Sequence, residues 1–547
     1  MKNKALLIIS LAVASISLSA CNFLPFFNQE EGGYSYRDVG ESDHQQSDIS
    51  TPPAGDLTAN KASMTYSDYI QNNIHPLSIT PSTRKTKLLV IPIWFNDSNN
   101  YVDSGHKDKV RADIATAYFG KETDTGWHTV KTFYETESIG SLTLNGTVSD
   151  WYEPNKNVSY YASDPKNSDS GAPKTSALAE SAVEWYFSNN PSENRRSYDA
   201  DADGYLDGVM LIYAAPDYTL LKNDAADNLW AYCYWIQDTS KQNPNNPGAN
   251  AFFWASYSFM YGSEVAYSRS GKTYAGGDTS HCSLDTHTFI HEMGHMFGLE
   301  DYYDYSEYSY QPAGGFSMQD ANVGGHDPFS SFALGWGKAY IPTTSVTIDL
   351  KSFVKSGEMI LLTPSWNSYN SPFDEYILLE YFTSESLNAL DTTYAYMKSA
   401  RKKYPTGTKE AGIRVWHVDA RLLYTRTGEY SINNTTTNPK ENKGVVTLLM
   451  SNTYADGKVD GYCSPLGPSY ANYNLLQLIR NDKSATHKNK DFIKESDFFR
   501  INDTFSMDSY KKQFVNSNKL NNGKSLGFTF TVNACNSTYA SITVTKV

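Results

Sequence analysis

The chain has 547 residues, of which 40% are hydrophobic and 19% are charged, a composition that is typical of globular proteins and excludes a largely disordered chain. This length allows two or three domains with sizeable cores. The formal net charge of −14 argues against binding to nucleic acid, because phosphate contacts need a basic surface.

The first twenty residues have the pattern of an export signal. Lys2 and Lys4 precede an apolar stretch over residues 5–17, which is too short to cross a bilayer as a helix. Residues 18–21 (LSAC) resemble a bacterial lipobox, which implies cleavage before Cys21 and a diacylglyceryl group on its sulfur. Two acyl chains suffice for stable attachment to a membrane. The alternative is an ordinary secretory signal in which Cys21 is incidental.

A polar segment follows this signal. Residues 22 to about 60 are rich in Ser, Asp, Gly, Gln and Pro and show no apolar periodicity, so we expect residues 21–84 to be a lipid-anchored flexible linker. No second apolar run of membrane length follows. We therefore expect an exported monomer that only its lipid holds at the outer face of the cell membrane, from which it can be released.

Strands and helices alternate between residues 85 and 340, which predicts an α/β or α+β domain. The hydrophobic pattern predicts strands at residues 87–95, 141–151, 209–215 and 229–235. It predicts helices at residues 107–119, 129–137, 173–187, 284–297 and 328–334. Pro92 removes one ladder donor from the first strand, so we expect a sheet edge or a bulge there.

An aspartate-rich segment precedes the strand at 209–215. Residues 199–207 (DADADGYLD) match the first nine positions of a calcium loop, with oxygen ligands at positions 1, 3, 5 and 9 and glycine at position 6. Position 12 is Met210 instead of a bidentate glutamate, so this is no complete EF-hand. The alternative is an aspartate-rich turn that leads into the strand. The tentative calcium ligands are Asp199, Asp201, Asp203, Tyr205 and Asp207.

The strongest chemical signal is the segment 291–301 (HEMGHMFGLED). Residues four apart share one face of a helix, so His291 and His295 can bind a single ion. Gly298 can adopt a positive φ that turns the chain back, which brings Asp301 toward the same ion. Two nitrogens, one carboxylate oxygen and an open fourth position are typical of catalytic zinc.

Glu292 is offset by one position from the face that carries the two histidines. Its carboxylate is therefore expected to reach a metal-bound water and not the metal. Zinc lowers the pKa of a bound water toward about 7, and Glu292 is predicted to accept the proton as general base and pass it to the leaving amine.

Several residues near this motif have weaker assignments. Met318, in the segment GGFSMQD, is a candidate hydrophobic floor beneath the metal. His326 is a possible substrate contact, with a structural role as the alternative. His417 lies in a predicted strand and is expected to be structural. No cysteine lies in a CxxC pair, so no cysteine-based zinc site is visible. A disulfide between Cys233 and Cys282 is possible in an oxidising compartment.

Beyond residue 340 the sequence changes character. Short runs rich in β-formers dominate residues 341–547 and predict a β-sandwich or a similar all-β module. The sequence does not decide whether this module binds substrate or only packs on the preceding domain.

The chain resembles the immune inhibitor A family of secreted bacterial metallopeptidases. The run HEMGHMFGLEDYYD, beginning at residue 291, carries the likeness most specifically. Further similar segments lie at residues 133–152, 199–215, 314–319, 374–382 and 412–419. The resemblance covers residues 85–340 well and residues 341–547 more loosely.

The resemblance implies an α+β, metzincin-like zinc protease domain at residues 85–340, with a mixed sheet and an active-site helix, and a β-rich, sandwich-like domain at residues 341–547. It places Zn²⁺ on His291, His295 and Asp301, with Glu292 as the base. It places Met318 in the methionine turn, and calcium is usual in such enzymes. One departure is that about 65 residues separate Cys21 from the first strand, which leaves no room for a full-sized propeptide.

Three functions fit these observations. The leading one is a surface metalloendopeptidase that cleaves extended segments of extracellular proteins. The alternatives are a non-catalytic adhesion lipoprotein with a vestigial zinc site and a zinc amidase that acts on cell-wall peptides. The intact Glu292 argues against a pure binding protein, which does not need the base.

Overall fold

The computed structural model describes most of the chain beyond residue 56. The described residues are 57–62, 79–125, 127–162, 172–223, 226, 228–236, 238–261, 284–303, 311–392, 397–399, 402–403, 407–426, 429–432, 446–449, 452, 473–487 and 491–547. The predicted signal peptide, the lipidation site Cys21, most of the predicted linker, Cys282 and Cys463 lie outside them.

The N-terminal half is built on a mixed sheet with the strand order β2-β1-β3-β5-β4. Its strands are β1 (Lys85–Ile93), β2 (Thr143–Val148), β3 (Val209–Tyr213), β4 (Tyr232–Trp235) and β5 (Ala251–Ser256). All neighbours pair in parallel except β4, which runs antiparallel to β5. The predicted mixed sheet is confirmed, although the hydrophobic pattern did not indicate β5.

Pro92 does not lie on an edge strand, because β1 is paired on both sides. The ladder between β1 and β2 is instead interrupted at this point. Regular pairing ends at Val90 with Val148, and a single bridge from Ile93 to Tyr152 resumes it. The expected irregularity is therefore present within an interior strand, and the edge assignment was wrong.

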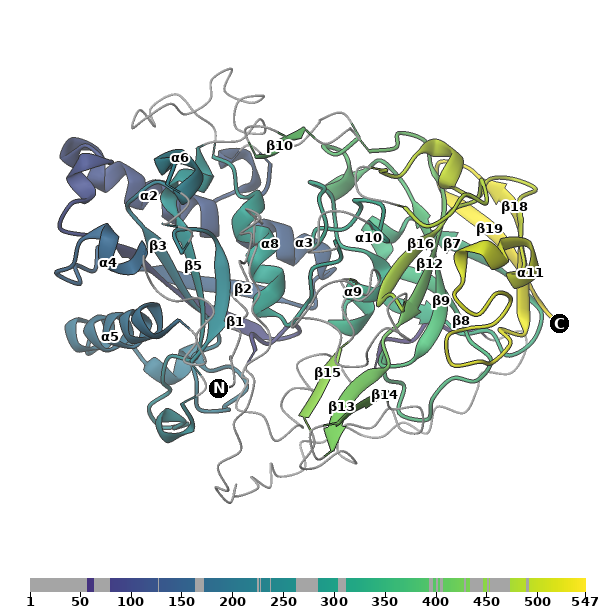
Figure 1. Ribbon diagram of the computed structural model, residues 1–547, viewed down its shortest axis with the longest axis horizontal. Helices are drawn as coiled ribbons and strands as arrows, with labels where there is room; N and C mark the ends of the chain where they lie inside the picture. Colours follow the sequence, from purple (N-terminus) through teal and green to yellow (C-terminus); the bar gives the residue numbers. More distant parts are fainter. Residues whose placement is uncertain are drawn as a thin grey trace, which may run out of the picture.

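Helices cover both faces of this sheet, as Figure 1 shows. On one face pack α2 (Lys107–Phe119), α3 (Val130–Glu137) and α8 (His287–Met296). On the other face pack α4 (Val158–Ala162) and α5 (Pro173–Asn189). Alternate residues of each strand point to opposite faces, so a sheet covered on both sides needs strands that are apolar throughout.

The C-terminal half is a β-sandwich, as predicted. One sheet has the order β16-β12-β9-β8-β6 and the other has the order β17-β18-β19-β7. Apolar side chains from both sheets form a common core between them. The strands are β6 (Lys338–Tyr340), β7 (Val346–Lys351), β8 (Glu358–Leu362), β9 (Glu375–Phe382), β12 (Gly412–Asp419), β16 (Leu476–Ile479), β17 (Thr504–Phe505), β18 (Phe528–Cys535) and β19 (Tyr539–Lys546).

Shorter elements complete the described fold. They are the helices α6 (Tyr218–Leu221), α9 (Pro328–Ala333), α10 (Phe353–Ser356) and α11 (Met507–Tyr510) and the strands β10 (Met397–Ser399), β11 (Lys402–Lys403), β13 (Leu422–Arg426), β14 (Glu429–Ile432) and β15 (Val446–Leu449).

The two halves share one hydrophobic core. The first sheet of the sandwich turns its other face toward the N-terminal half, and Leu378, Trp416 and Leu476 on that face belong to the same buried cluster as Met318 and Phe332. Figure 1 shows α8 and α3 between the two large sheets. The question left open by the sequence is thus answered in part, since the C-terminal module packs on the domain before it.

The predicted linker ends earlier than residue 84. Ile79 is 2% exposed, and the backbone of Asn60 pairs in both directions with Ala339. The side chain of Lys61 donates to Ser141. Residues 57–62 and 79–84 therefore pack on the folded body, and the prediction of a flexible tether is wrong for them. None of the helices in the described part of the chain has the length and hydropathy needed to span a bilayer.

Candidate metal centre

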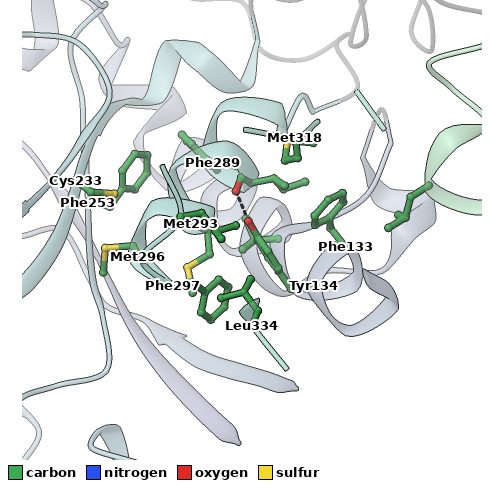
Figure 2. Close-up of a cluster of buried hydrophobic side chains, with 14 of the residues drawn as sticks. Phe133, Tyr134, Cys233, Phe253, Phe289, Met293, Met296, Phe297, Met318 and Leu334 are labelled. Atoms are coloured by element: carbon green, nitrogen blue, oxygen red, sulfur yellow. Dashed lines mark hydrogen bonds between the residues drawn. The ribbon is translucent and has the colours of Figure 1, made fainter. Parts of the chain in front are cut away.

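Helix α8 carries the two histidines of the motif on one face, one turn apart. Its apolar side is shown in Figure 2, where Met293 and Phe297 lie near Tyr134 of α3. The Tyr134 hydroxyl donates to the carbonyl of Ile290 at 2.6 Å. Buried side chains thus fix the apolar side of the helix, and its two histidines are buried as well.

The chain turns back directly after α8. Gly298 has a φ of 93°, and its N–H donates to the carbonyl of His295 at 2.8 Å, while the N–H of Leu299 donates to Gly294 at 3.1 Å. Such bonds are typical of a helix that ends in a left-handed glycine. Three residues later, Asp301 lies fully buried beside the two histidines.

The structure brings the three predicted zinc ligands together. Asp301 Oδ1 lies 3.1 Å from His291 Nε2 and 3.3 Å from His295 Nε2, and the two Nε2 atoms are 3.2 Å apart. A tetrahedral zinc ion with bonds of about 2.0–2.1 Å would separate its ligand atoms by roughly 3.4 Å. The three side chains form one of two groups in the described residues that could hold a metal ion.

The hydrogen bonds of the rings show which nitrogens face the ion. His291 Nδ1 lies 2.8 Å from the carbonyl of Met318, and His295 Nδ1 lies 2.7 Å from the carbonyl of Leu299. A carbonyl can only accept, so each Nδ1 carries the proton and each Nε2 of a neutral ring is an acceptor. Three acceptor atoms in mutual contact fit a bound cation.

Glu292 is 1% exposed and lies beside this group. The Cys233 thiol, on β4, donates to its backbone carbonyl at 3.1 Å and lies 3.8 Å from its carboxylate Oε2. Burial raises the pKa of Glu292, although the neighbouring histidines oppose the shift. The environment of Glu292 therefore makes its carboxylate a stronger proton acceptor than an exposed glutamate.

The segment around Met318 contacts the candidate ligands through its backbone and through the side chain of Gln319. Besides the bond from His291 to the Met318 carbonyl, the N–H of Tyr302 donates to the Gln319 carbonyl at 2.9 Å. The Gln319 amide nitrogen lies 3.3 Å from His295 Nδ1. A Cβ on Gly294 would lie 2.1 Å from Gln319 Oε1, so the Gln319 amide can occupy its position against α8 only beside a glycine.

Glu137, a buried carboxyl at the end of α3, hydrogen-bonds to His326 and Ser331, which follow this segment in the chain. Its Oε1 accepts from the N–H of His326 at 3.2 Å and from Ser331 Oγ at 3.3 Å. Burial raises the pKa of Glu137 to about 8, although these two hydrogen bonds oppose the shift. The carbonyl of Gly325, the residue before His326, accepts from the N–H of Met318 at 3.2 Å.

His326 itself is 5% exposed, and its ring packs against Phe133, Tyr134 and Trp336. Within the part of the chain that the structure describes, neither ring nitrogen has a hydrogen-bond partner. Burial lowers the pKa of His326 to about 3, with the two histidines of α8 adding to the shift. This placement favours a structural role, and contact with substrate stays a prediction. His417 lies in β12 and bonds to Glu375 at 2.9 Å, as a structural residue does.

Sequence reasoning missed His287 and Gln319. The ring of His287 stacks on that of His291, with 6.3 Å between the centroids, and its Nε2 contacts the carbonyl of Asn322 at 2.7 Å. Its position four residues before His291 is a signal that could have found it. Nothing in the local sequence marks Gln319, because its role comes from the approach of two distant segments.

The aspartate-rich loop forms the second group that could hold a cation. The carboxylates of Asp199, Asp201 and Asp207 lie within 4.8 Å of one another, whereas Asp203 accepts from the N–H of Tyr205 at 2.8 Å and is not in the group. Burial, followed by the neighbouring carboxylates, raises the pKa of Asp201 and Asp207 well above the usual value. A divalent cation would relieve this repulsion.

Residues 77–318 match the family model described as immune inhibitor A peptidase M6, catalytic domain. The match includes both clusters of candidate metal ligands and begins before residue 85, the predicted start of the domain. No curated protein sequence matches the chain.

We predict that Gly294→Ala lowers zinc affinity by about 10–100-fold, because the new Cβ displaces the Gln319 amide, which lies beside His295, and disturbs the adjoining backbone that orients His291. Gln319→Ala removes the atom that the Cβ would meet. The double variant should therefore bind zinc more tightly than Gly294→Ala alone. Competition with a chromogenic chelator measures these affinities, with Gln319→Ala as the matched control. Wild-type affinity in Gly294→Ala would contradict the prediction.

We predict a pH-dependent contribution of Glu137 to stability. The folded chain keeps its proton up to about pH 8, whereas the unfolded chain releases it near 4.5. The folded state therefore binds the extra proton in this window, and its free energy of unfolding falls as pH rises, by at most about 1.4 kcal/mol per pH unit.

Glu137→Gln removes this titration. The variant should gain stability relative to wild type as pH rises through the window, as measured by urea unfolding at several pH values. Glu135→Gln, on the same helix and half-buried, is the control. A difference between Glu137→Gln and wild type that does not change with pH would refute the assignment.

Proposed function

Since the chain belongs, through residues 77–318, to the immune inhibitor A family of M6 peptidases, we propose that it is a zinc endopeptidase that acts on extracellular proteins from the outer face of the cell membrane. The family makes it a peptide hydrolase. The observation that carries the proposal is the contact of three acceptor atoms, from His291, His295 and Asp301, beside the buried carboxylate of Glu292.

In this proposal His291, His295 and Asp301 hold the ion, and the carbonyls of Met318 and Leu299 fix the two rings. A bound zinc ion supplies a Lewis acid that polarises the scissile carbonyl and lowers the pKa of a coordinated water to about 7. Glu292 accepts the proton of the attacking water at its carboxylate. Because burial raises its pKa, Glu292 can hold that proton and donate it to the leaving nitrogen as the C–N bond breaks.

Assays of casein, gelatin and peptidoglycan cleavage distinguish the proposed function from two alternatives. A binding lipoprotein with a vestigial zinc site would not cleave casein or gelatin, and a cell-wall amidase would cleave neither while releasing peptides from peptidoglycan. The placement of Glu292 next to the ligand group supports catalysis, since a pure binding protein gains nothing from a buried base.

We predict that Glu292→Gln keeps zinc but loses about 10²–10⁴-fold in kcat, because the proton acceptor is gone while the ligands remain. The measurements are casein hydrolysis and zinc content of the chain from Asn22 onward. His295→Ala, which removes a ligand, should lose both metal and activity, and a chelator should abolish wild-type activity. Equal turnover by Glu292→Gln and wild type would remove the mechanism.

The proposal includes a lipid anchor on Cys21. The lipobox-like residues 18–21 and the short apolar stretch before them support it, and M6 peptidases are typically secreted. Residues 57–62 already pack on the folded body, so a tether between Cys21 and residue 56 would set the distance between membrane and active site.

We also propose a structural calcium ion at Asp199, Asp201 and Asp207, with Asp203 and Tyr205 as further candidate ligands. Three carboxylates within 4.8 Å of one another support it. Thr80 connects the loop to helix α8 by two hydrogen bonds. Its Oγ1 donates to the Asp207 carbonyl at 2.6 Å, and its N–H donates to the Met296 carbonyl at 2.8 Å. Calcium in this loop would therefore stabilise the C-terminal end of α8.

Calcium at about 100 times its dissociation constant should raise the free energy of unfolding of the wild type by about 2.7 kcal/mol. Asp201→Asn removes one charged ligand and should lose most of this increase, as followed by thermal unfolding with and without Ca²⁺. Asp150→Asn, an exposed aspartate outside the loop, serves as control. A calcium effect of equal size in both variants would argue against this site.

A further inference from the structure

The C-terminal module contacts the segments that support the metal centre, and it does so at their backbone. The loop that leads into Met318 is paired with the module at three points: the N–H of Gln311 donates to His487, the N–H of Leu478 donates to Pro312, and the N–H of Ile493 donates to Gly314. The three distances are 2.9, 2.9 and 3.0 Å. This loop is thus hydrogen-bonded to the sandwich just before Met318, whose carbonyl accepts from His291.

Asn452 extends this contact to the residue after Asp301. Its amide nitrogen donates to the carbonyl of Tyr302 and to that of Leu476, both at 2.8 Å. Its Oδ1 accepts from the N–H of Leu476 at 3.0 Å. One fully buried side chain therefore joins β16 to Tyr302. Since the N–H of Tyr302 bonds to Gln319, both backbone groups of the residue next to Asp301 are held.

Asn388 is a second asparagine of the module that contacts a segment near the metal centre, at Gly325. Its Oδ1 accepts from the N–H of Gly325 at 3.1 Å, and its Nδ2 donates to the carbonyl of Thr383 at 3.2 Å. The carbonyl of Gly325 accepts from Met318, whose own carbonyl receives His291 Nδ1. Three hydrogen bonds thus connect an amide of the module to a zinc-binding ring.

These contacts suit a positioning role. An amide side chain can donate and accept at once, so it can bridge two strands of backbone without bringing a charge near the ion. Groups that hydrogen-bond to metal ligands or to their supports fix ligand orientation, and their loss typically costs about 10–100-fold in metal affinity. Packing alone would need only the apolar face that the two halves share.

We propose that the C-terminal module completes the metal centre, with Asn452 as a positioning residue for Asp301 and Asn388 as a positioning residue for His291. This inference rests on the proposed function, because it takes these two residues as zinc ligands. The module then acts on metal binding as well as on stability, and each asparagine acts through the backbone of a segment from the catalytic domain.

The experiment compares Asn452→Ala and Asn388→Ala with Gln513→Ala in the mature full chain. Gln513 is a matched control, because its buried amide also bridges backbone in both directions, with Oε1 accepting from the N–H of Arg480 at 2.7 Å and Nε2 donating to its carbonyl at 2.8 Å. Among the bonds of the described residues, none joins Gln513 to the metal-centre segments. Zinc affinity is measured by chelator competition and ligand geometry by the absorption spectrum of the Co²⁺-loaded chain.

We expect zinc affinity to fall about 10-fold or more in each asparagine variant, with an altered Co²⁺ spectrum, whereas Gln513→Ala loses thermal stability but keeps both properties. Asn388 is only half-buried, so Asn388→Ala is expected to fold. It can test the inference even if Asn452→Ala does not fold. Asparagine variants with the affinity and spectrum of Gln513→Ala would overturn the inference and leave the proposed function intact. A wild-type chain that takes up neither Zn²⁺ nor Co²⁺ would overturn both.

Discussion

The structure depends on one electrostatic constraint, which is that two ring nitrogens and a carboxylate oxygen lie 3.1–3.3 Å apart in a buried site. Three acceptors repel one another unless a cation lies among them. Each contact around them keeps that arrangement in place. The carbonyls of Met318 and Leu299 fix the tautomers of the two rings, and the turn at Gly298 fixes the return of Asp301.

The fold provides this arrangement by burying α8 between two sheets. The mixed sheet supports the helix from one side, and the sandwich encloses the Met318 segment from the other. Because both sheets contribute to a single hydrophobic core, the helix cannot shift without disturbing apolar contacts in both halves. A close-packed interior of this kind transmits small displacements instead of absorbing them.

The sequence predicted those parts of the site that depend on local spacing. His291, His295 and Asp301 are brought together by one helical turn and one glycine, and both are visible in eleven consecutive residues. The hydrophobic pattern likewise predicted the mixed sheet and the sandwich. It failed at β5, at the interior position of Pro92 and at residues 79–84, where pairing with distant segments decides the structure. Gln319 and Asn452 could not be predicted either, since their partners lie 24 and 150 residues away in the chain.

The contacts of Asn452 and β16 have a consequence for the order in which the chain matures. Both belong to the last fifth of the polypeptide, whereas the residues that they hold were synthesised long before. Because the chain is synthesised from its N-terminal end, His291 and Asp301 are present before the strands that would fix their surroundings. On this arrangement a partly synthesised chain has all of the candidate ligand residues and lacks the residues that would hold them in place. The complete metal centre would then form last.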